Sequence, residues 1–268
     1  MEWFEAMILG LIQGLTEFLP VSSSGHLEIG KVILGVEATD DLLFTTMVHA
    51  ATVLSTIVVF RKQIWNLFKG FFKFKYNDET DYLLKMAVSI IPIMIVGLFF
   101  KDQVEALFGS IKVVGIALIF TSALLFFSDY SSKSDSPRSG GKEARNGISY
   151  WQALVVGLGQ ALAVIPGLSR SGTTISTGLI CGVRRDVMAQ FSFLMVLIPI
   201  LGETFLEVVG GEFASSTVGA LPLLVGFVSA FLSGLFACKV MIALVKKAKL
   251  SYLAIYCLIA AAVIFIFA

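Results

Sequence analysis

The sequence predicts an all-α polytopic membrane protein in which six transmembrane helices and two re-entrant helical hairpins form an inverted-topology repeat. Three observations predict this fold class. First, 57% of the residues are hydrophobic and only 15% are charged, which exceeds the apolar share of ordinary soluble domains. Second, several stretches are long and apolar enough to cross a bilayer. Third, two segments resemble each other, and both are interrupted by Pro, Gly and Ser.

Six stretches satisfy the requirement of a spanning helix for about 20 mostly apolar residues. They are residues 42–60, 83–100, 112–128, 187–208, 219–238 and 251–268. Residues 3–36 and 151–183 are also apolar, but each contains Pro, Gly and Ser where a span should be continuous. Non-helical backbone at membrane depth must be buried in protein or line a polar cavity. We therefore expect these two segments to be re-entrant hairpins.

The charge argues against a nucleic-acid-binding protein, the first residues argue against a cleaved signal peptide, and the cysteine spacing argues against a disulfide or metal framework. The net charge is +1 and no basic run is interleaved with aromatic residues, so nucleic acid is not an expected partner. The first residues include Glu2 and Glu5 rather than a basic region, so we expect no cleaved signal peptide. The three cysteines lack paired spacing and are expected to be buried thiols: Cys181, Cys238 and Cys257.

Basic residues predict the orientation of the spans, because cytoplasmic loops carry an excess of Lys and Arg. That excess falls in residues 61–85, 131–146 and 239–249, whereas the short loops around 36–41, 101–110 and 210–217 lean acidic. The polar stretch 131–148 is the predicted linker. We expect a single membrane domain over 1–268, composed of repeat one (1–130), this linker, and repeat two (149–268).

Residues 6–36 align without gaps with residues 153–183. The identical pairs include Gln13 with Gln160, Ser22 with Ser169, and Gly25 with Gly172. Each copy is a hairpin followed by three predicted spans, and an odd number of spans leaves the second copy upside down. Inverted repeats with broken helices place a binding site where the two broken segments meet.

The first hairpin carries a small and polar stripe at helical spacing, formed by Ala6, Gly10, Gln13 and Glu17. A carboxylate at membrane depth costs about 2.5 kcal/mol or more on insertion scales, so Glu17 is a functional candidate. The alternative is a structural carboxylate that is hydrogen-bonded across a helix interface.

The loop after Pro20 contains hydroxyls, backbone N–H groups and an imidazole in the run Ser22, Ser23, Ser24, Gly25 and His26. A serine hydroxyl becomes nucleophilic when a neighbouring base accepts its proton. The alternative is a serine-rich turn that caps the following helix. His49 lies within a predicted span, where it could line the same cavity or be a hydrogen-bonded core histidine.

The second hairpin supplies a candidate phosphate clamp. Arg170 stays charged and presents a planar fork of donors that suits phosphate oxygens. Hydroxyls and N–H groups at the start of the next helix would add to an anion pocket; they belong to Ser169, Ser171, Gly172 and Thr174. Because Glu17 aligns with Val164 and Arg170 aligns with Ser23, the two copies are expected to share one site.

Two motifs, QGLTEFLPVSSSGH (13–26) and PGLSRSGTTIS (166–176), resemble the bacterial undecaprenyl-diphosphate phosphatase family linked to bacitracin resistance. The resemblance implies hydrolysis of undecaprenyl diphosphate to undecaprenyl phosphate and inorganic phosphate, which recycles the carrier lipid for peptidoglycan synthesis. It places a multi-pass protein in the inner membrane with its active site facing the periplasm. It implies catalytic roles for Glu17, Ser23, His26 and Arg170, and substrate binding by Gln13, Ser22, Ser24, Gly25, Ser169, Ser171, Gly172 and Thr174.

One departure from the family pattern affects the mechanism. Many members have Glu where this chain has Gln13, so neither a two-carboxylate mechanism nor a paired-carboxylate metal site follows from the resemblance, and Glu17 is expected to act alone or with water. A metal site built by protein alone is not expected either, because no Asp, Glu and His cluster has ligand spacing. A hydrated Mg²⁺ or Ca²⁺ could still bridge the diphosphate and Glu17.

The hypothesis is that Arg170 and loop amides hold the diphosphate, that Ser23 or a water attacks the terminal phosphorus, and that Glu17 and His26 move protons. Which of the last two is the acid stays open, as does a homodimer. The alternative function is a flippase or transporter of the lipid phosphate or another anion, because inverted repeats with broken helices are also a transporter architecture.

Overall fold

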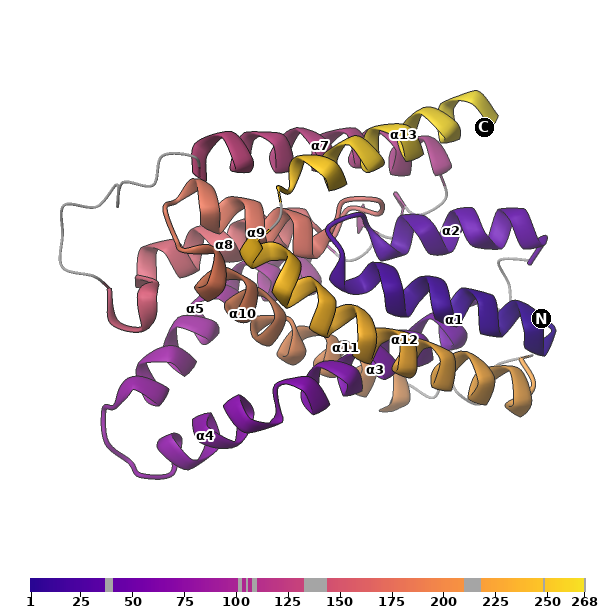
Figure 1. Ribbon diagram of the computed structural model, residues 1–268. Coiled ribbons are helices and arrows are strands. Elements are labelled where there is room, and N and C mark those ends of the chain that lie inside the picture. The colour runs from indigo at the N-terminus through magenta and orange to yellow at the C-terminus, as the bar shows by residue number, and fades with distance from the viewer. Residues whose placement is uncertain are drawn as a thin grey trace.

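The structure is a computed structural model that describes residues 1–36, 41–100, 103–104, 106–107, 110–132, 144–209, 218–247 and 249–267. All regular secondary structure within these residues is helical, which confirms the predicted fold class at the level of all-α. Figure 1 shows one bundle of helices with the N- and C-termini at the same end.

The long apolar helices make this a polytopic membrane protein. Stretches 78–99, 111–131, 185–202 and 220–245 are long and apolar enough to cross a bilayer. They belong to α5 (Asp78–Phe99), α7 (Ile111–Ser132), the consecutive α10 (Arg185–Met195) and α11 (Leu197–Val209), and α12 (Ala220–Lys247). A fifth span requires α3 (Asp41–Val59) and α4 (Arg61–Phe71) to act together, although they meet at an angle of 75°. The last helix, α13 (Ser251–Phe267), has a shorter apolar run, so the count of six spans stays a prediction.

The helix boundaries differ from the predicted spans mainly where polar residues extend a helix. Helix α5 begins before the predicted residue 83, because the Asn77 side chain caps it and acidic residues occupy its first turn. Helix α12 continues past the predicted residue 238 to Lys247, since a lysine such as Lys239 can extend its charged end toward water. The predicted linker and outer loops lie mostly outside the described residues.

Both predicted hairpins are pairs of helices joined by a short non-helical turn. The first consists of α1 (Trp3–Phe18) and α2 (Ser23–Leu34), and the second of α8 (Tyr150–Leu162) and α9 (Arg170–Ile180). Leu19 is extended, as expected of a residue that precedes a proline. The side chains of Ser22 and Ser169 accept hydrogen bonds from the backbone N–H groups of Gly25 and Gly172, at 3.2 and 3.1 Å. Each serine therefore starts the second helix of its hairpin.

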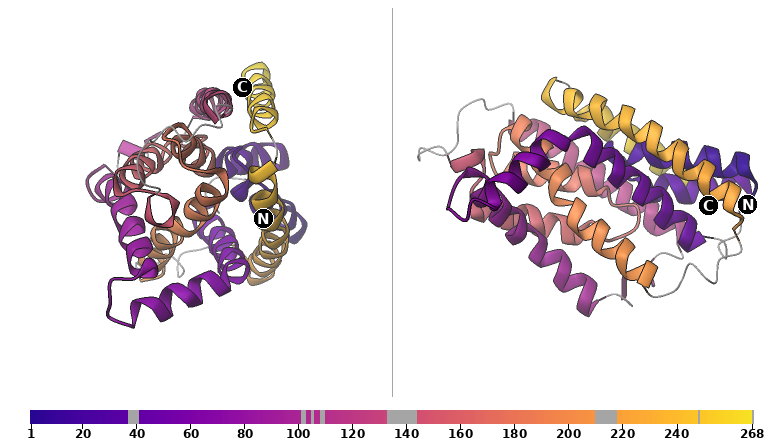
Figure 2. Two further views of the ribbon diagram at one scale, coloured as in Figure 1. Left: turned by 60° about the vertical axis from the view of Figure 1, so that its left-hand side comes forward. Right: turned by 90° about the horizontal axis from the view of Figure 1, so that it is seen from below.

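Glycines allow the first helix of each hairpin to lie close against a long helix. Helix α1 packs on α12, and α8 packs on α5. A Cβ atom at Gly10 would lie 2.4 Å from the Gly226 carbonyl oxygen, and one at Gly157 would lie 2.2 Å from the Ser89 carbonyl oxygen. Helices α7 and α13 also pack together and lie side by side at one edge of the bundle in Figures 1 and 2.

A buried ion pair fastens the start of the second hairpin to α5. Lys85 Nζ donates to Asp81 at 2.5 Å and to the Arg145 carbonyl oxygen at 2.7 Å. The Asp81 carboxylate also accepts from Tyr76 and Tyr150, at 2.6 and 3.1 Å. Asp81 and Lys85 are each 2% exposed, so these partners replace the water that both charges lose.

We predict that Asp81→Ala destabilises the protein by about 3 kcal/mol, because it leaves the Lys85 cation buried without its carboxylate. Asp78→Ala is the matched control, since Asp78 pairs with Arg145 at an exposed position, where an ion pair contributes little. Unfolding of the detergent-solubilised chain, followed by intrinsic fluorescence, measures both. Equal losses in the two variants would contradict the prediction.

Candidate functional site

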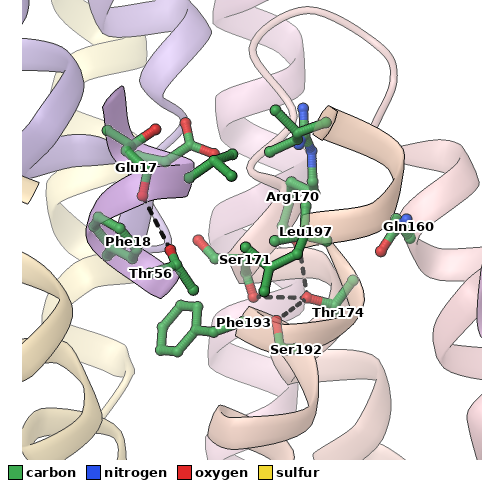
Figure 3. A pocket seen from close by; sticks show the side chains of 14 residues that line it. Glu17, Phe18, Thr56, Gln160, Arg170, Ser171, Thr174, Ser192, Phe193 and Leu197 are labelled. Carbon is green, nitrogen blue, oxygen red and sulfur yellow. Dashed lines mark hydrogen bonds between the residues drawn. The ribbon is translucent and has the colours of Figure 1, made fainter. Parts of the chain in front are cut away.

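A small pocket lies between the two hairpins and is also lined by residues of α3, α10 and α11. Glu17 of α1 and Arg170 of α9 lie on opposite walls of this pocket, as Figure 3 shows. Polar residues line part of it: Glu17, Thr52, Thr56, Gln160, Arg170, Ser171, Thr174 and Ser192. The remaining lining is apolar: Phe18, Val53, Phe193, Val196, Leu197 and Ile200.

Glu17 is the centre of a hydrogen-bond cluster on the α1 side of the pocket. Its Oε2 accepts from Ser23 Oγ at 2.5 Å and from Gln13 Nε2 at 2.9 Å. His49 Nε2 lies 3.7 Å from the same oxygen, and the Glu17 side chain is 12% exposed. A carboxylate hydrogen-bonded to a serine hydroxyl can accept its proton, and Gln13 fixes the orientation of that carboxylate. The structure thus brings Ser23 and Glu17 together, whereas Ser23 is not among the residues that line the pocket. Their roles as nucleophile and base stay predictions.

The turn that carries Ser23 has an unusual backbone. Ser22 has φ of +70°, which is rare for a residue other than glycine. Such strained positions cluster at functional sites, where the surrounding structure holds them in place. The Ser22 side chain, its Gly25 partner and the start of α2 hold this turn so that Ser23 points back to Glu17.

The second turn presents Arg170 at the first position of α9. Its guanidinium makes no hydrogen bond or ion pair with the part of the chain that the structure describes. The nearby Thr174 hydroxyl already has protein partners, because its Oγ1 lies 2.9 Å from the Arg170 carbonyl oxygen and 2.6 Å from Ser192 Oγ. The Arg170 guanidinium therefore faces the pocket with donors that are not hydrogen-bonded to the described residues, and it interacts electrostatically with Glu17. Such a planar fork of donors suits phosphate oxygens.

The tips of the two hairpins touch through a reciprocal pair of hydrogen bonds. Gly167 N–H donates to Ser24 Oγ at 3.4 Å, and Ser171 Oγ donates to the Leu19 carbonyl oxygen at 3.1 Å. Two residues predicted to bind substrate, Ser24 and Ser171, therefore hold one turn against the other. Their substrate contacts stay predictions, as do those of Ser22, Ser169, Gly25 and Gly172.

The two histidines have different positions relative to Glu17. His26 Nδ1 donates to the Ser22 carbonyl oxygen at 2.7 Å, and its Nε2 accepts from the Tyr256 hydroxyl at 2.7 Å. It also stacks on Tyr256 and is absent from the pocket lining. His49 Nδ1 donates to the Thr45 carbonyl oxygen at 2.8 Å, which directs Nε2 toward Glu17. Proton transfer by His26 stays a prediction, whereas His49 is the histidine that the fold brings to the carboxylate.

Sequence reasoning missed several pocket residues. Thr52 and Thr56 follow His49 at helical spacing on α3, and this periodicity was a signal that could have found them. Gln160 could have been found because it aligns with Gln13. Ser192 and the apolar residues of α10 and α11 had no such signal, because they lie in ordinary apolar helices.

Comparisons with known proteins agree over nearly the whole chain. The family model described as "Bacitracin resistance protein BacA" matches residues 6–263. A protein of Bacteroides thetaiotaomicron named "Undecaprenyl-diphosphatase" is 55% identical over 264 residues, covering 97% of each chain. Proteins with the same name from Christiangramia forsetii and Korarchaeum cryptofilum are 48% and 35% identical, covering 100% and 97% of each chain.

We predict that Gly14→Ala lowers activity on the order of a hundredfold, since misplacing a reacting group by about 1 Å can have that effect. A Cβ at Gly14 would lie 2.4 Å from the Ala230 carbonyl oxygen, so α1 must move away from α12 and carry Glu17 with it. Gly97→Ala is the matched control, because the space around its Cβ is open. Turnover of the purified variants is the measurement, and full activity of Gly14→Ala would contradict this account.

Proposed function

Because this chain belongs to the bacitracin resistance protein BacA family, we propose that it works as its relatives are named, as an undecaprenyl-diphosphatase, through Glu17, Ser23 and Arg170. It is a membrane hydrolase that converts undecaprenyl diphosphate to undecaprenyl phosphate and inorganic phosphate, in the service of cell-wall synthesis and bacitracin resistance. The observation that carries the assignment of the site is the Ser23–Glu17 hydrogen bond of 2.5 Å, with Arg170 on the opposite wall of the pocket that Glu17 lines.

The proposed reaction begins with the terminal phosphate held by the Arg170 guanidinium. Ser23 Oγ attacks the terminal phosphorus while Glu17 accepts the hydroxyl proton. A new O–P bond forms as the bond from phosphorus to the bridging oxygen breaks, and undecaprenyl phosphate leaves with that electron pair. Glu17 then releases the proton to solvent as undecaprenyl phosphate departs. Water attacks the phosphoserine while Glu17 accepts the water proton, the bond from phosphorus to Ser23 Oγ breaks, Glu17 returns the proton to Oγ, and inorganic phosphate is released. Most of the acceleration would come from positioning and from charge stabilisation by Arg170.

Neighbouring side chains support this pair without taking part in bond formation. Gln13 holds the Glu17 carboxylate by its amide, in the place where many family members have a second carboxylate. His49 Nε2 lies 3.7 Å from the oxygen that accepts from Ser23. His26 steadies the Ser22 turn through its hydrogen bond to the Ser22 carbonyl oxygen.

The pocket is compatible with a divalent cation that arrives with the substrate. The described residues contain no group of three or more His, Cys, Asp and Glu that could hold a metal alone. A hydrated Mg²⁺ or Ca²⁺ needs only one or two carboxylates together with phosphate oxygens. We propose Glu17 as its single protein ligand, and the cation would screen the charge of the diphosphate.

The predicted inverted repeat determines the side of the membrane from which each hairpin enters. The reciprocal bonds between Ser24 and Gly167 and between Ser171 and Leu19 are what two copies related by a pseudo-two-fold axis would make. In Figure 1 the α1–α2 hairpin lies toward the end with both termini, and α8–α9 lies toward the other end. We therefore propose an inverted repeat with six spans in the inner membrane, with α1–α2 entering from the periplasm. A homodimer stays a prediction.

We predict that Arg170→Ala and Glu17→Gln each lower phosphate release from undecaprenyl diphosphate by about a hundredfold or more, as expected for the loss of charge stabilisation or of the base. Arg184→Ala is the matched control, because Arg184 pairs with Asp186 at an exposed position. Release is measured with detergent-purified protein, with and without EDTA. A well-folded parent that releases no phosphate with added Mg²⁺ or Ca²⁺ would favour transport instead.

We predict that Ser23→Ala abolishes the phosphoenzyme and lowers turnover by about a thousandfold, because no other hydroxyl is hydrogen-bonded to Glu17 among the described residues. Acid quenching of the parent with terminally ³²P-labelled substrate should trap label on the protein. Thr16→Val serves as the comparison, since it removes a hydroxyl that bonds to the Ile12 carbonyl oxygen and does not line the pocket, and it should keep the label. Normal turnover by Ser23→Ala would assign the attack to water.

A further inference from the structure

Gln160 has a buried amide without a protein partner. It lies on α8 with 0% exposure, and neither Nε2 nor Oε1 has a hydrogen bond to the residues that the structure describes. Gln160 also lines the pocket, on the same side as Arg170 in Figure 3. Buried polar groups are nearly always paired, and leaving one unpaired is costly. A partner from the pocket would satisfy this amide.

The matching position in the first hairpin shows what Gln160 lacks. Gln13 donates to Glu17, which is one helical turn further along α1. The residue four positions after Gln160 is Val164, just beyond the end of α8, and its side chain has no acceptor. The same amide therefore orients a carboxylate in one hairpin and is left free in the other.

The neighbouring polar groups on this wall are already used by the protein. Ser171 Oγ donates to the Leu19 carbonyl oxygen. Thr174 Oγ1 lies within hydrogen-bond distance of the Arg170 and Ser171 carbonyl oxygens and of Ser192 Oγ. Among the described residues of this wall, the Arg170 guanidinium and the Gln160 amide are the polar groups left for a ligand.

We propose that Gln160 is a second phosphate-binding residue, which contacts the same phosphate group as Arg170. Its Nε2 donates to a non-bridging phosphate oxygen, and its Oε1 accepts from a water molecule that hydrates that phosphate. The arginine has only donors, whereas the amide offers two donors and an acceptor. The neutral amide adds a hydrogen bond without adding charge. This role rests on the proposed phosphatase function, because it takes the diphosphate as the occupant of the pocket.

The test compares the intact detergent-purified chain with Gln160→Leu and Gln160→Glu. Inorganic diphosphate is the probe, both as a competitor of phosphate release and as a ligand in calorimetry. Gln160→Leu should raise its inhibition constant and the KM of the lipid substrate by about tenfold, the effect of one lost hydrogen bond to a charged group. Gln160→Glu should weaken binding further, since a carboxylate repels phosphate.

Thermal unfolding distinguishes ligand binding from a structural role. Replacing an unpaired buried amide by leucine should leave the unfolding temperature unchanged or raise it. Thr173→Val is the matched control, because the Thr173 hydroxyl is also buried without a partner but does not line the pocket. Its affinity for diphosphate should equal that of the parent. Parental affinity in Gln160→Leu, or a loss that follows a fall in unfolding temperature, would overturn the proposal.

The two proposals fail in different ways. A parent that binds diphosphate through Gln160 but releases no phosphate would contradict the phosphatase site and leave the binding role intact. A parent that releases phosphate normally, with Gln160→Leu equally active and equally inhibited, would contradict only the role of Gln160.

Discussion

The contact between the two hairpin tips is the interaction on which the site depends. Both turns contain backbone that is not helical, and within a membrane protein its polar groups must be satisfied by protein or by a polar cavity. Ser24 and Ser171 do this reciprocally, each bonding to the backbone of the opposite turn. The same contact keeps Glu17, with its hydrogen-bonded Ser23, opposite Arg170 across the pocket.

Helix packing around the tips gives the pocket both polar and apolar walls. Glycines let α1 lie close against α12, and α8 close against α5. This packing fixes the position of the first helix of each hairpin. The polar lining gathers around Glu17 and Arg170, whereas Phe18, Phe193 and Leu197 supply apolar surface. In the proposed function, the diphosphate would contact the polar lining residues. The adjoining isoprenoid chain would pack on the apolar lining residues, and this contact would remove apolar surface of both from water.

Much of the site could be predicted because it is encoded locally. The stripe that contains Gln13 and Glu17 follows from helical spacing, and Ser22 and Ser169 are recognisable helix caps. The alignment of the two hairpins predicted that Glu17 and Arg170 share one site. His49 shows the limit: its sequence neighbours have no charge, and only the approach of α1 to α3 reveals that its Nε2 faces Glu17.

By itself, the sequence determined the all-α membrane class, the position of both hairpins and the residue types of the two turns, because hydropathy, helical period and capping act over a few residues. Only the tertiary structure decided the contacts that join distant segments. It directed His26 to Tyr256, brought His49 to Glu17 and left the Gln160 amide unpaired. These outcomes depend on how whole helices pack, and packing is set by the sum of many small contacts that no single segment specifies.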